Sequence, residues 1–402
     1  MAADNSYGYI LNRLFPKGLA DATYRDPKTT LLALIRKDPK GGGQGLDIPV
    51  QYTAGGGRSH TFATGKSNAG NGPDGIRFKL DYADDYAWAQ VTAKNMRAAK
   101  TRDGGVVDVL DNAFKTATRK IKRSICRGLA GDGTACVGVI GSIPSSGVLK
   151  LADWRDSKNI EVGDVLVSAA AKSTGALDTG SALVTAVDGS KNQGLITVTY
   201  QDSFSPTANH YLFIQGDRNL AMKGLAAWLP ATAPTSGDSF GGVDRSVAPH
   251  ALAGIREDVS GESSIRESLL AGMESFRTYN CDTTHIITSP FDFTRLEREL
   301  EDKKSIVDVP NEYELGIKGI MLEDGSIVVM DPFFAKGYAY PINLETWTLE
   351  SMDEAPHIAD EDGLKMLRMD TADAFEAMIR YWAQVRCDDP SQNGVLILPT
   401  LS

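Results

Sequence analysis

The stretch LDNAFKTATRKIKRSICRGLA, residues 110–130, is the most informative part of this 402-residue chain. Its apolar residues recur at steps of three or four, the spacing of one buried helical stripe; they are Phe114, Ala117, Ile121, Ile125 and Leu129. The other faces of this predicted helix carry six bases: Lys115, Arg119, Lys120, Lys122, Arg123 and Arg127. No acidic residue lies between Asp111 and Asp132, so nothing within the helix neutralises these charges. We therefore expect a negatively charged partner outside it.

This basic surface has two interpretations. Its bases either contact nucleic acid or an acidic scaffold, through phosphate-type contacts that read no sequence, or form ordinary surface paired with acids elsewhere in the chain. Residues 345–389 offer such acids, because they hold twelve Asp or Glu against four Lys or Arg, a net charge of −8. Salt-bridged surface is the more common role of a charged helix face, so the pattern alone does not decide between the two.

The composition indicates a globular protein. With 42% hydrophobic and 23% charged residues, the chain is long enough for two or three cores. Its net charge of −10 and pI near 5.1 argue against a general nucleic-acid binder, so any contact with nucleic acid would be local. No apolar run approaches about eighteen residues and no signal-peptide core precedes residue 20, which predicts a soluble protein made in the cytoplasm. Four isolated cysteines predict reduced thiols, not a zinc site or disulfides: Cys126, Cys136, Cys281 and Cys387.

The region before the basic helix predicts extended structure. Residues 1–45 mix short apolar clusters with prolines and a glycine run, which suits an arm better than a core. Two predicted strands follow, 46–53 and 76–96, and the glycine-rich loop between them is far longer than a usual hairpin loop. In the second strand, Ile76, Phe78 and Leu80 alternate with charged residues, the period-2 pattern of two unlike faces. A two-stranded ribbon is marginal alone in water, so we expect it to lie on a neighbouring subunit.

The region after the basic helix changes character. Residues 140–217 are rich in short strands and turns, which predicts a small barrel or sandwich inserted into a larger domain. The predicted strands are 148–151, 165–169, 182–187, 195–200 and 211–215.

From residue 224 the pattern becomes mixed α/β. It predicts a helix over 263–278, a strand over 285–288 and a second helix to about 302, which Ser289 caps and Pro290 and Asp292 begin. Alternation over 375–386 predicts one strand of unusual length.

The sequence contains no motif of a catalytic or metal site. The runs Gly41–Gly43 and Gly55–Gly57 lack the lysine and hydroxyl residue of a phosphate loop. The five histidines show no metal-ligand spacing, and neither a G-x-S-x-G elbow nor a marked carboxylate pair occurs. We therefore predict no enzyme activity, no cofactor and no metal, while an active site assembled by the fold stays open.

The order of these segments resembles the major capsid proteins of tailed bacteriophages, which share the Hong Kong 97-like fold. The resemblance covers nearly the whole chain, and its local anchors are LIRKDPKGG at 34–42, GLAAWLP at 224–230, VDRS at 243–246, Ser289–Pro290 opening a helix, and the final long strand followed by DPSQNG at 389–394. Each anchor is weak alone, and their order along the chain carries the resemblance.

The resemblance implies an α+β fold with an N-terminal arm, an extended β-hairpin loop, a long spine helix, peripheral and axial domains, and an inserted barrel-like domain. The implied boundaries are an arm at 1–45, an extended loop at 46–100, the spine helix with the start of the peripheral and axial domains at 101–149, a β-rich insertion at 150–216, an axial domain at 217–337, and returning peripheral strands with the C-terminus at 338–402.

The resemblance also implies a function. Such a subunit self-assembles into pentamers and hexamers that form an icosahedral shell around double-stranded DNA. The implied partners are further copies of the chain, scaffold and portal proteins, a decoration protein on the insertion, and packaged DNA held by non-specific contact, with no membrane. The implied location is the virion capsid, assembled in the bacterial cytoplasm. The six bases then become inner-surface or inter-subunit contacts, and no motif supports covalent cross-linking.

Two other functions stay open. An encapsulin-like compartment would use the same fold around protein cargo, so the contents of a particle distinguish it from a virus. A β-rich carbohydrate-active enzyme or adhesin would need a carboxylate pair in a cleft and would remain a small oligomer. The five tryptophans are scattered along the chain, which counts modestly against a sugar-binding platform.

Overall fold

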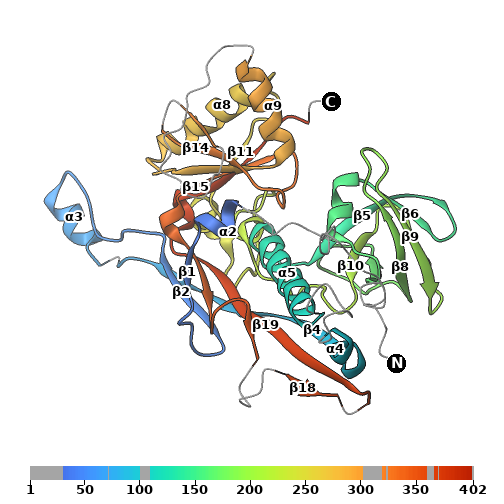
Figure 1. Cartoon of the computed structure of the whole chain (residues 1–402). Coiled ribbons are helices and arrows are strands. Elements are labelled where there is room, and N and C mark those ends of the chain that lie inside the picture. Colours follow the sequence, from blue (N-terminus) through green and yellow to red (C-terminus); the bar gives the residue numbers. More distant parts are fainter. Residues whose placement is uncertain are drawn as a thin grey trace. The chain divides into compact units, whose positions relative to one another are not determined.

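The computed structural model describes residues 30–70, 72–99, 109–301, 319–322, 325–359, 366–369 and 371–400 (Figure 1). The chain divides into two compact units, a discontinuous one made of residues 1–130 and 222–402 and a second one, Gly131–Ala221. The architecture is mixed α+β, with two six-stranded sheets and a two-stranded ribbon in the first unit and a closed barrel in the second.

A long strand, β19 (Ala374–Cys387), forms the centre of the first sheet. Along one edge it pairs with β4 (Ala83–Thr92) over ten residues in continuous antiparallel register. Its other edge pairs with β16 (Trp347–Ser351), β17 (His357–Ile358) and β18 (Leu367–Arg368). The short strand β1 (Arg36–Asp38) adds to β16 in parallel. The predicted long C-terminal strand is thus confirmed, and it organises the sheet.

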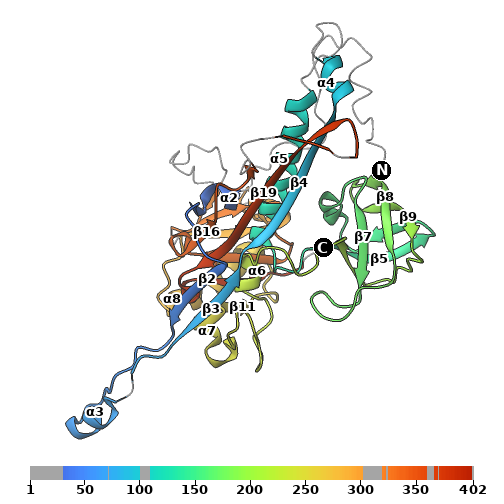
Figure 2. The same ribbon diagram turned by 90° about the horizontal axis from the view of Figure 1, so that it is seen from below.

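The basic helix, α5 (Val109–Ala130), packs against β4 and β19 (Figure 2). The predicted stripe is buried at Ala117, Ile121, Ile125 and Leu129, each at most 5% exposed. Two short helices, α2 (Thr30–Leu34) and α4 (Ala93–Ala99), also contact α5. Near its C-terminal end, Gly224 approaches so closely that a Cβ there would lie 2.1 Å from the carbonyl oxygen of Gly128. The helix and its buried stripe are confirmed for the described part.

The ribbon consists of β2 (Gly45–Gln51) and β3 (Gly75–Asp81), paired antiparallel, with helix α3 (Phe62–Asn68) in the loop between them. The predicted single strand over 76–96 is wrong. It breaks at Tyr82, because the chain changes its hydrogen-bonding partner there from β2 to β19, and it becomes helical at Ala93. Alternating hydrophobicity looks the same on both sides of the break, so the sequence hid this change.

An aromatic cluster holds the base of the ribbon on the first unit. Phe78 of β3 is fully buried and meets the ring of Trp228 at 5.0 Å, edge to face. Phe240 lies 5.0 Å from the same indole, and the Arg245 guanidinium stacks over Phe240 at 4.3 Å. The amide of Lys79 donates to the carbonyl of Gly241 at 2.9 Å, which covers part of the outer edge of β3. The base of the ribbon is therefore fixed by packing, while the loop beyond it is not.

A second sheet has the order β11-β20-β15-β12-β14-β13. Its strands are Ile255–Asp258, Gly394–Ile397, Tyr338–Ile342, His285–Thr288, Ile327–Met330 and Gly319–Met321, in that order. Helices α8 (Ile265–Thr278) and α9 (Pro290–Glu301) pack with it around a separate apolar cluster. The predicted strand 285–288 and both predicted helices are confirmed.

The second unit is a closed barrel with the order β10-β5-β6-β9-β8-β7. Its strands in chain order are Cys136–Ser145, Val148–Leu151, Val165–Ala169, Ser181–Asp188, Leu195–Gln201 and Tyr211–Ile214. The predicted barrel is confirmed, but its predicted start at 150 differs from the structure. Strand β5 belongs to the barrel because it pairs with both β6 and β10, and pairing across sixty or more residues cannot be seen in local sequence.

Candidate assembly surfaces

The six bases on α5 flank its buried stripe. Lys115 and Lys120 are exposed, while Arg119, Lys122, Arg123 and Arg127 are partly buried. The structure therefore places the six basic residues on one continuous helix, as the sequence predicted, and Lys115 and Lys120 are the two most exposed among them.

Arg127 has an acidic neighbour on the first sheet. Burial raises the pKa of the Asp85 carboxyl, and the Ser124 hydroxyl and the Arg127 charge oppose that rise. Asp85 lies on β4, so this base meets an acid from outside the C-terminal region that the sequence offered as a partner.

Several C-terminal acids pair within their own region. Arg386 binds both Glu350 and Asp388 through its guanidinium group. Arg368 lies 3.3 Å from Asp373, where both side chains are exposed. Glu350, Asp373 and Asp388 thus have basic partners within residues 345–389.

The loop of the ribbon carries an unsupported apolar side chain. Phe62 at the start of α3 is 85% exposed, and no residue of α3 is buried. The charged residues from 53 to 72 are both basic, Arg58 and Lys66, and the segment holds no acid. Figure 2 shows α3 far out along the ribbon, away from the sheets of the first unit. Among the described residues of its unit, none buries this aromatic ring.

A second aromatic surface lies on the face of the first sheet that points away from α5. Tyr86 and Trp88 of β4 are 47% and 52% exposed. The indole N–H of Trp382 donates to the Tyr86 hydroxyl at 3.3 Å, and the Arg380 guanidinium stacks on Trp382 at 4.1 Å. Tyrosine, tryptophan and arginine are the residues most enriched at the energetic centres of protein interfaces.

The described residues include no group of three or more His, Cys, Asp or Glu that could hold a metal ion. One polar constellation in the barrel was missed from sequence. The Asp178 carboxylate accepts a hydrogen bond from Ser168 at 2.6 Å and lies 2.7 Å from Nδ1 of His210. Although burial acts the other way, these two bonds lower the pKa of Asp178. The acid sits between serine and histidine, so the histidine cannot activate the serine hydroxyl. The arrangement ties the loop of Asp178 to strand β7 and to the residue that precedes β10.

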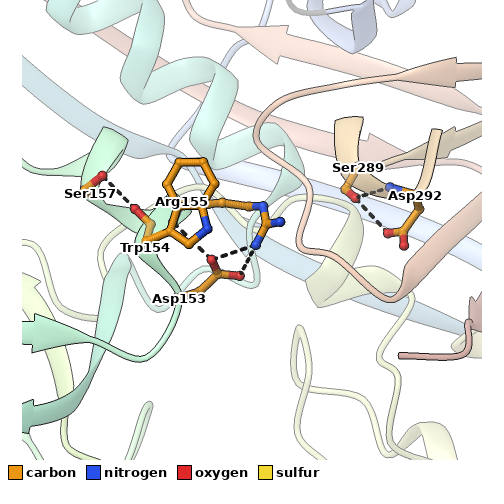
Figure 3. Close-up of polar contacts among 6 residues, drawn as sticks. All are labelled: Asp153, Trp154, Arg155, Ser157, Ser289 and Asp292. Carbon is orange, nitrogen blue, oxygen red and sulfur yellow. Dashed lines mark hydrogen bonds and ion pairs between the residues drawn. The ribbon is translucent and has the colours of Figure 1, made fainter. Parts of the chain in front are cut away.

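Two further polar clusters are helix caps (Figure 3). Asp153 accepts from the amide of Arg155 at 3.0 Å and from its guanidinium at 3.1 Å. The Ser289 hydroxyl accepts from the amide of Asp292 at 3.2 Å and donates to its carboxylate at 2.7 Å. The predicted start of α9 is confirmed, and both clusters satisfy backbone amides that a helix end leaves unpaired.

None of the helices in the described ranges is sufficiently long and apolar to cross a bilayer.

Comparison with known proteins gives the class of fold. No protein-family model matches the sequence, and no curated protein matches it. Among solved structures, a chain of the cyanophage A-1(L) capsid asymmetric unit is similar over 96% of this chain and 98% of that one, with a TM-score of 0.55 and 14% sequence identity. This chain therefore has the fold of a phage capsid protein.

Weaker similarities extend over comparable lengths. The capsid of a native GTA particle covers 98% of this chain and 97% of its own, at 7% identity and a TM-score of 0.47. The holo-SrpI encapsulin complex of Synechococcus elongatus PCC 7942 covers 95% and 94%, at 8% identity and a TM-score of 0.43.

Proposed function

We propose that this chain is the major capsid protein of a tailed bacteriophage, with a Hong Kong 97-like fold. It self-assembles into pentamers and hexamers that close an icosahedral shell around double-stranded DNA. The observation that carries this proposal is the end-to-end fold similarity to a cyanophage capsid chain, which spans nearly all of both chains.

The ribbon supports assembly as the function. Its base is fixed by buried aromatic packing, whereas its loop holds an 85% exposed phenylalanine away from the sheets. A shell gains stability from many weak contacts repeated by symmetry, and an extended segment increases the contact area across each subunit border.

The parts of the chain then have proposed roles. Residues 1–45 form the arm, whose helix α2 and strand β1 pack on the first unit. Residues 46–100 form the extended loop, 101–130 the spine helix, 222–337 the axial domain and 338–402 the returning peripheral strands, with the sequence-based boundaries at 149 and 217 moved to the ends of the barrel. The barrel, Gly131–Ala221, is an insertion that stabilises capsomers or receives a decoration protein. Scaffold and portal proteins complete assembly in the bacterial cytoplasm, and the role of the chain is structural, without catalysis.

The basic face of α5 is the proposed contact for packaged DNA or for a neighbouring subunit. Non-specific contact with phosphates needs only positive charge on an accessible surface. The six residues of this face are Lys115, Arg119, Lys120, Lys122, Arg123 and Arg127.

Negative-stain electron microscopy of the purified full chain, paired with light scattering, tests the proposal. We expect closed shells of uniform size, with nucleic acid in particles isolated from infected cells. Shells filled with protein would favour the encapsulin-like alternative. Small oligomers at every salt and protein concentration, even with the phage scaffold co-expressed, would contradict the capsid function.

A further inference from the structure

Strand β4 is the open edge of the first sheet. Among the residues that the structure describes, it pairs only with β19, over all ten of its residues and without a bulge. The amide of Ala93, just past its end, donates to Asp373 on the β19 side. Because backbone groups alternate in direction along an antiparallel strand, odd-numbered residues of β4 face β19 and even-numbered ones face away. Trp88 and Gln90 thus present their N–H and C=O groups outward.

An edge of this kind is unusual in a stable protein. Open edges invite pairing with another chain, and proteins normally block them with proline, bulges or inward charges. The ribbon of this chain shows such a block. The amide of Lys79 points away from β2, toward Gly241, so the backbone N–H and C=O groups of the odd-numbered residues of β3 face outward. The β2 residues in register with them point their backbone groups away from β3 in the same way. Pro49, which is in register with Arg77, is one of these residues. Proline has no N–H to offer, so β2 cannot extend a ladder there. Strand β4 contains no proline.

The charges along β4 are arranged for antiparallel pairing with an identical strand. Asp84 and Asp85 lie at its beginning, and Lys94 and Arg97 lie just beyond its end. Parallel alignment of two copies would oppose acid with acid. Antiparallel alignment about a two-fold axis at Ala89 places Trp88 opposite Gln90 of the other copy. It also brings Asp84 near the start of helix α4 of the other copy, which carries Lys94 and Arg97.

We propose that β4 pairs with β4 of a second copy of this chain across a two-fold axis at Ala89, which joins two sheets into one. The biological role of this contact rests on the proposed capsid function, whereas the strand pairing itself is argued from the edge of β4. In this register the outward amides of Trp88 and Gln90 find carbonyl partners. The amide of Tyr86 keeps its bond to the Asp85 carboxylate, 2.9 Å away. The exposed rings of Tyr86 and Trp88 from both copies then lie on one shared face and are withdrawn from water.

Hydrogen–deuterium exchange of the full chain tests the edge directly. We expect the amides of Trp88 and Gln90 to exchange at least about tenfold more slowly in the assembled protein than in isolated subunits. The amides of Ala87 and Ala89 serve as the internal control, because they bond to β19 in both states. Equal exchange at Trp88 and Gln90 in both states would overturn the proposal.

Cross-linking identifies the partner strand. The double variant Trp88→Cys with Gln90→Cys should form dimers on a non-reducing gel, because directly opposed residues lie within disulfide range. The offset pair Tyr86→Cys with Gln90→Cys should not. Protected amides without the first cross-link would mean that another chain occupies the edge, and the pairing of identical strands would be wrong.

A backbone variant separates this contact from side-chain effects. Gln90→Pro removes one outward N–H and leaves every backbone bond to β19, so it should abolish the dimer contact. Gln90→Ala should keep that contact, and it matches the proline variant in losing the side-chain bond to Glu376. Closed shells lacking the 88–90 cross-link would leave the capsid function intact and overturn the edge pairing. Cross-linked dimers that never form shells would support the edge pairing and contradict the capsid function.

Discussion

At the scale of single residues, several buried or partly buried polar groups fix local structure. Ser289 and Asp153 satisfy helix ends, and Asp178 holds Ser168 and His210 together. Asp156 differs from these, because burial raises its pKa to about 6 and the nearby Asp153 charge adds to the effect. A carboxyl that resists ionisation within the fold makes stability depend on pH.

The substitution Asp156→Asn should stabilise the protein at pH 8 by about 3 kcal/mol. The folded state holds the Asp156 proton more tightly than the unfolded chain, whose ordinary carboxyl has a pKa of 3.8. In the parent protein, protonated Asp156 therefore contributes its full stability below about pH 4, and this contribution is lost as the pH rises through about 6. Unfolding by urea at pH 4 and pH 8 measures the difference.

The matched control is Asp188→Asn in the same barrel. Its exposed carboxylate accepts hydrogen bonds from Ser190, which lower its pKa, so this variant should gain no stability at pH 8. An Asp156→Asn protein with the same pH dependence as the parent would refute the assignment.

The substitution Ser289→Ala should cost about 1 kcal/mol, because the amide of Asp292 loses its cap. Ser275→Ala, within helix α8, serves as the control and should change the free energy of unfolding by less than about 0.5 kcal/mol. Thermal unfolding of the full chain checks both. If both variants changed the free energy of unfolding equally, the capping role of Ser289 would be wrong.

At the scale of elements, α5 and the ribbon each have a part that is buried in the first unit and a part that is more exposed. The apolar stripe of α5 is buried against β4 and β19, while its bases flank that contact. The base of the ribbon is buried among aromatic rings, while its loop holds Phe62 in solvent. Each element thus has a buried part within the unit, and its proposed contact lies outside that part.

Replacing Arg119, Lys120 and Arg123 with Glu should impair assembly or packaging and leave the subunit folded. The change reverses three charges on the proposed DNA or subunit contact without touching the buried stripe. Circular dichroism checks folding, and electron microscopy with nucleic-acid quantification checks particles.

A control with the same change in net charge carries Glu at Lys191, Arg277 and Arg298, all exposed positions outside α5. Normal full particles from the α5 variant would eliminate this helix as a functional contact.

At the scale of the whole molecule, the two units have separate apolar cores. Residues Gly131–Ala221 close a barrel around their own cluster, and the other unit contains two further clusters. Ala130 is the last residue of the discontinuous unit before the barrel, and Met222 is the first after it. Each unit therefore has the apolar core that a stable fold of its own requires.

Deleting residues 53–74, with an Asn-Gly turn joining β2 to β3, should abolish shells without unfolding the body. The deleted loop contains no buried residue in α3, so little folding energy is lost, whereas every subunit border loses a contact. Particle mass by light scattering and thermal unfolding of the same sample give both readouts. Phe62→Ser is the milder companion variant and should weaken assembly less; unchanged shells from the deletion would exclude the loop from assembly.

Local sequence determined those elements whose signal lies within one segment. The stripe of α5, the cap of α9, five of the six barrel strands and the alternation of β19 follow from side-chain spacing and backbone preference, which act over a few residues. The six bases on α5 were found in the same way, although their role in assembly or packaging stays a prediction.

Only the tertiary structure decided the pairings. It showed that the chain after Tyr82 leaves β2 for β19, that β5 closes the barrel, that Arg127 meets Asp85, and that β4 is an open edge. A hydrogen bond between strands depends on residues far apart in the chain, and an alternating strand carries the same pattern whichever strand it joins. The physical reason is that side-chain periodicity encodes which face of a strand is buried, whereas its partner is chosen by the packing of the whole fold.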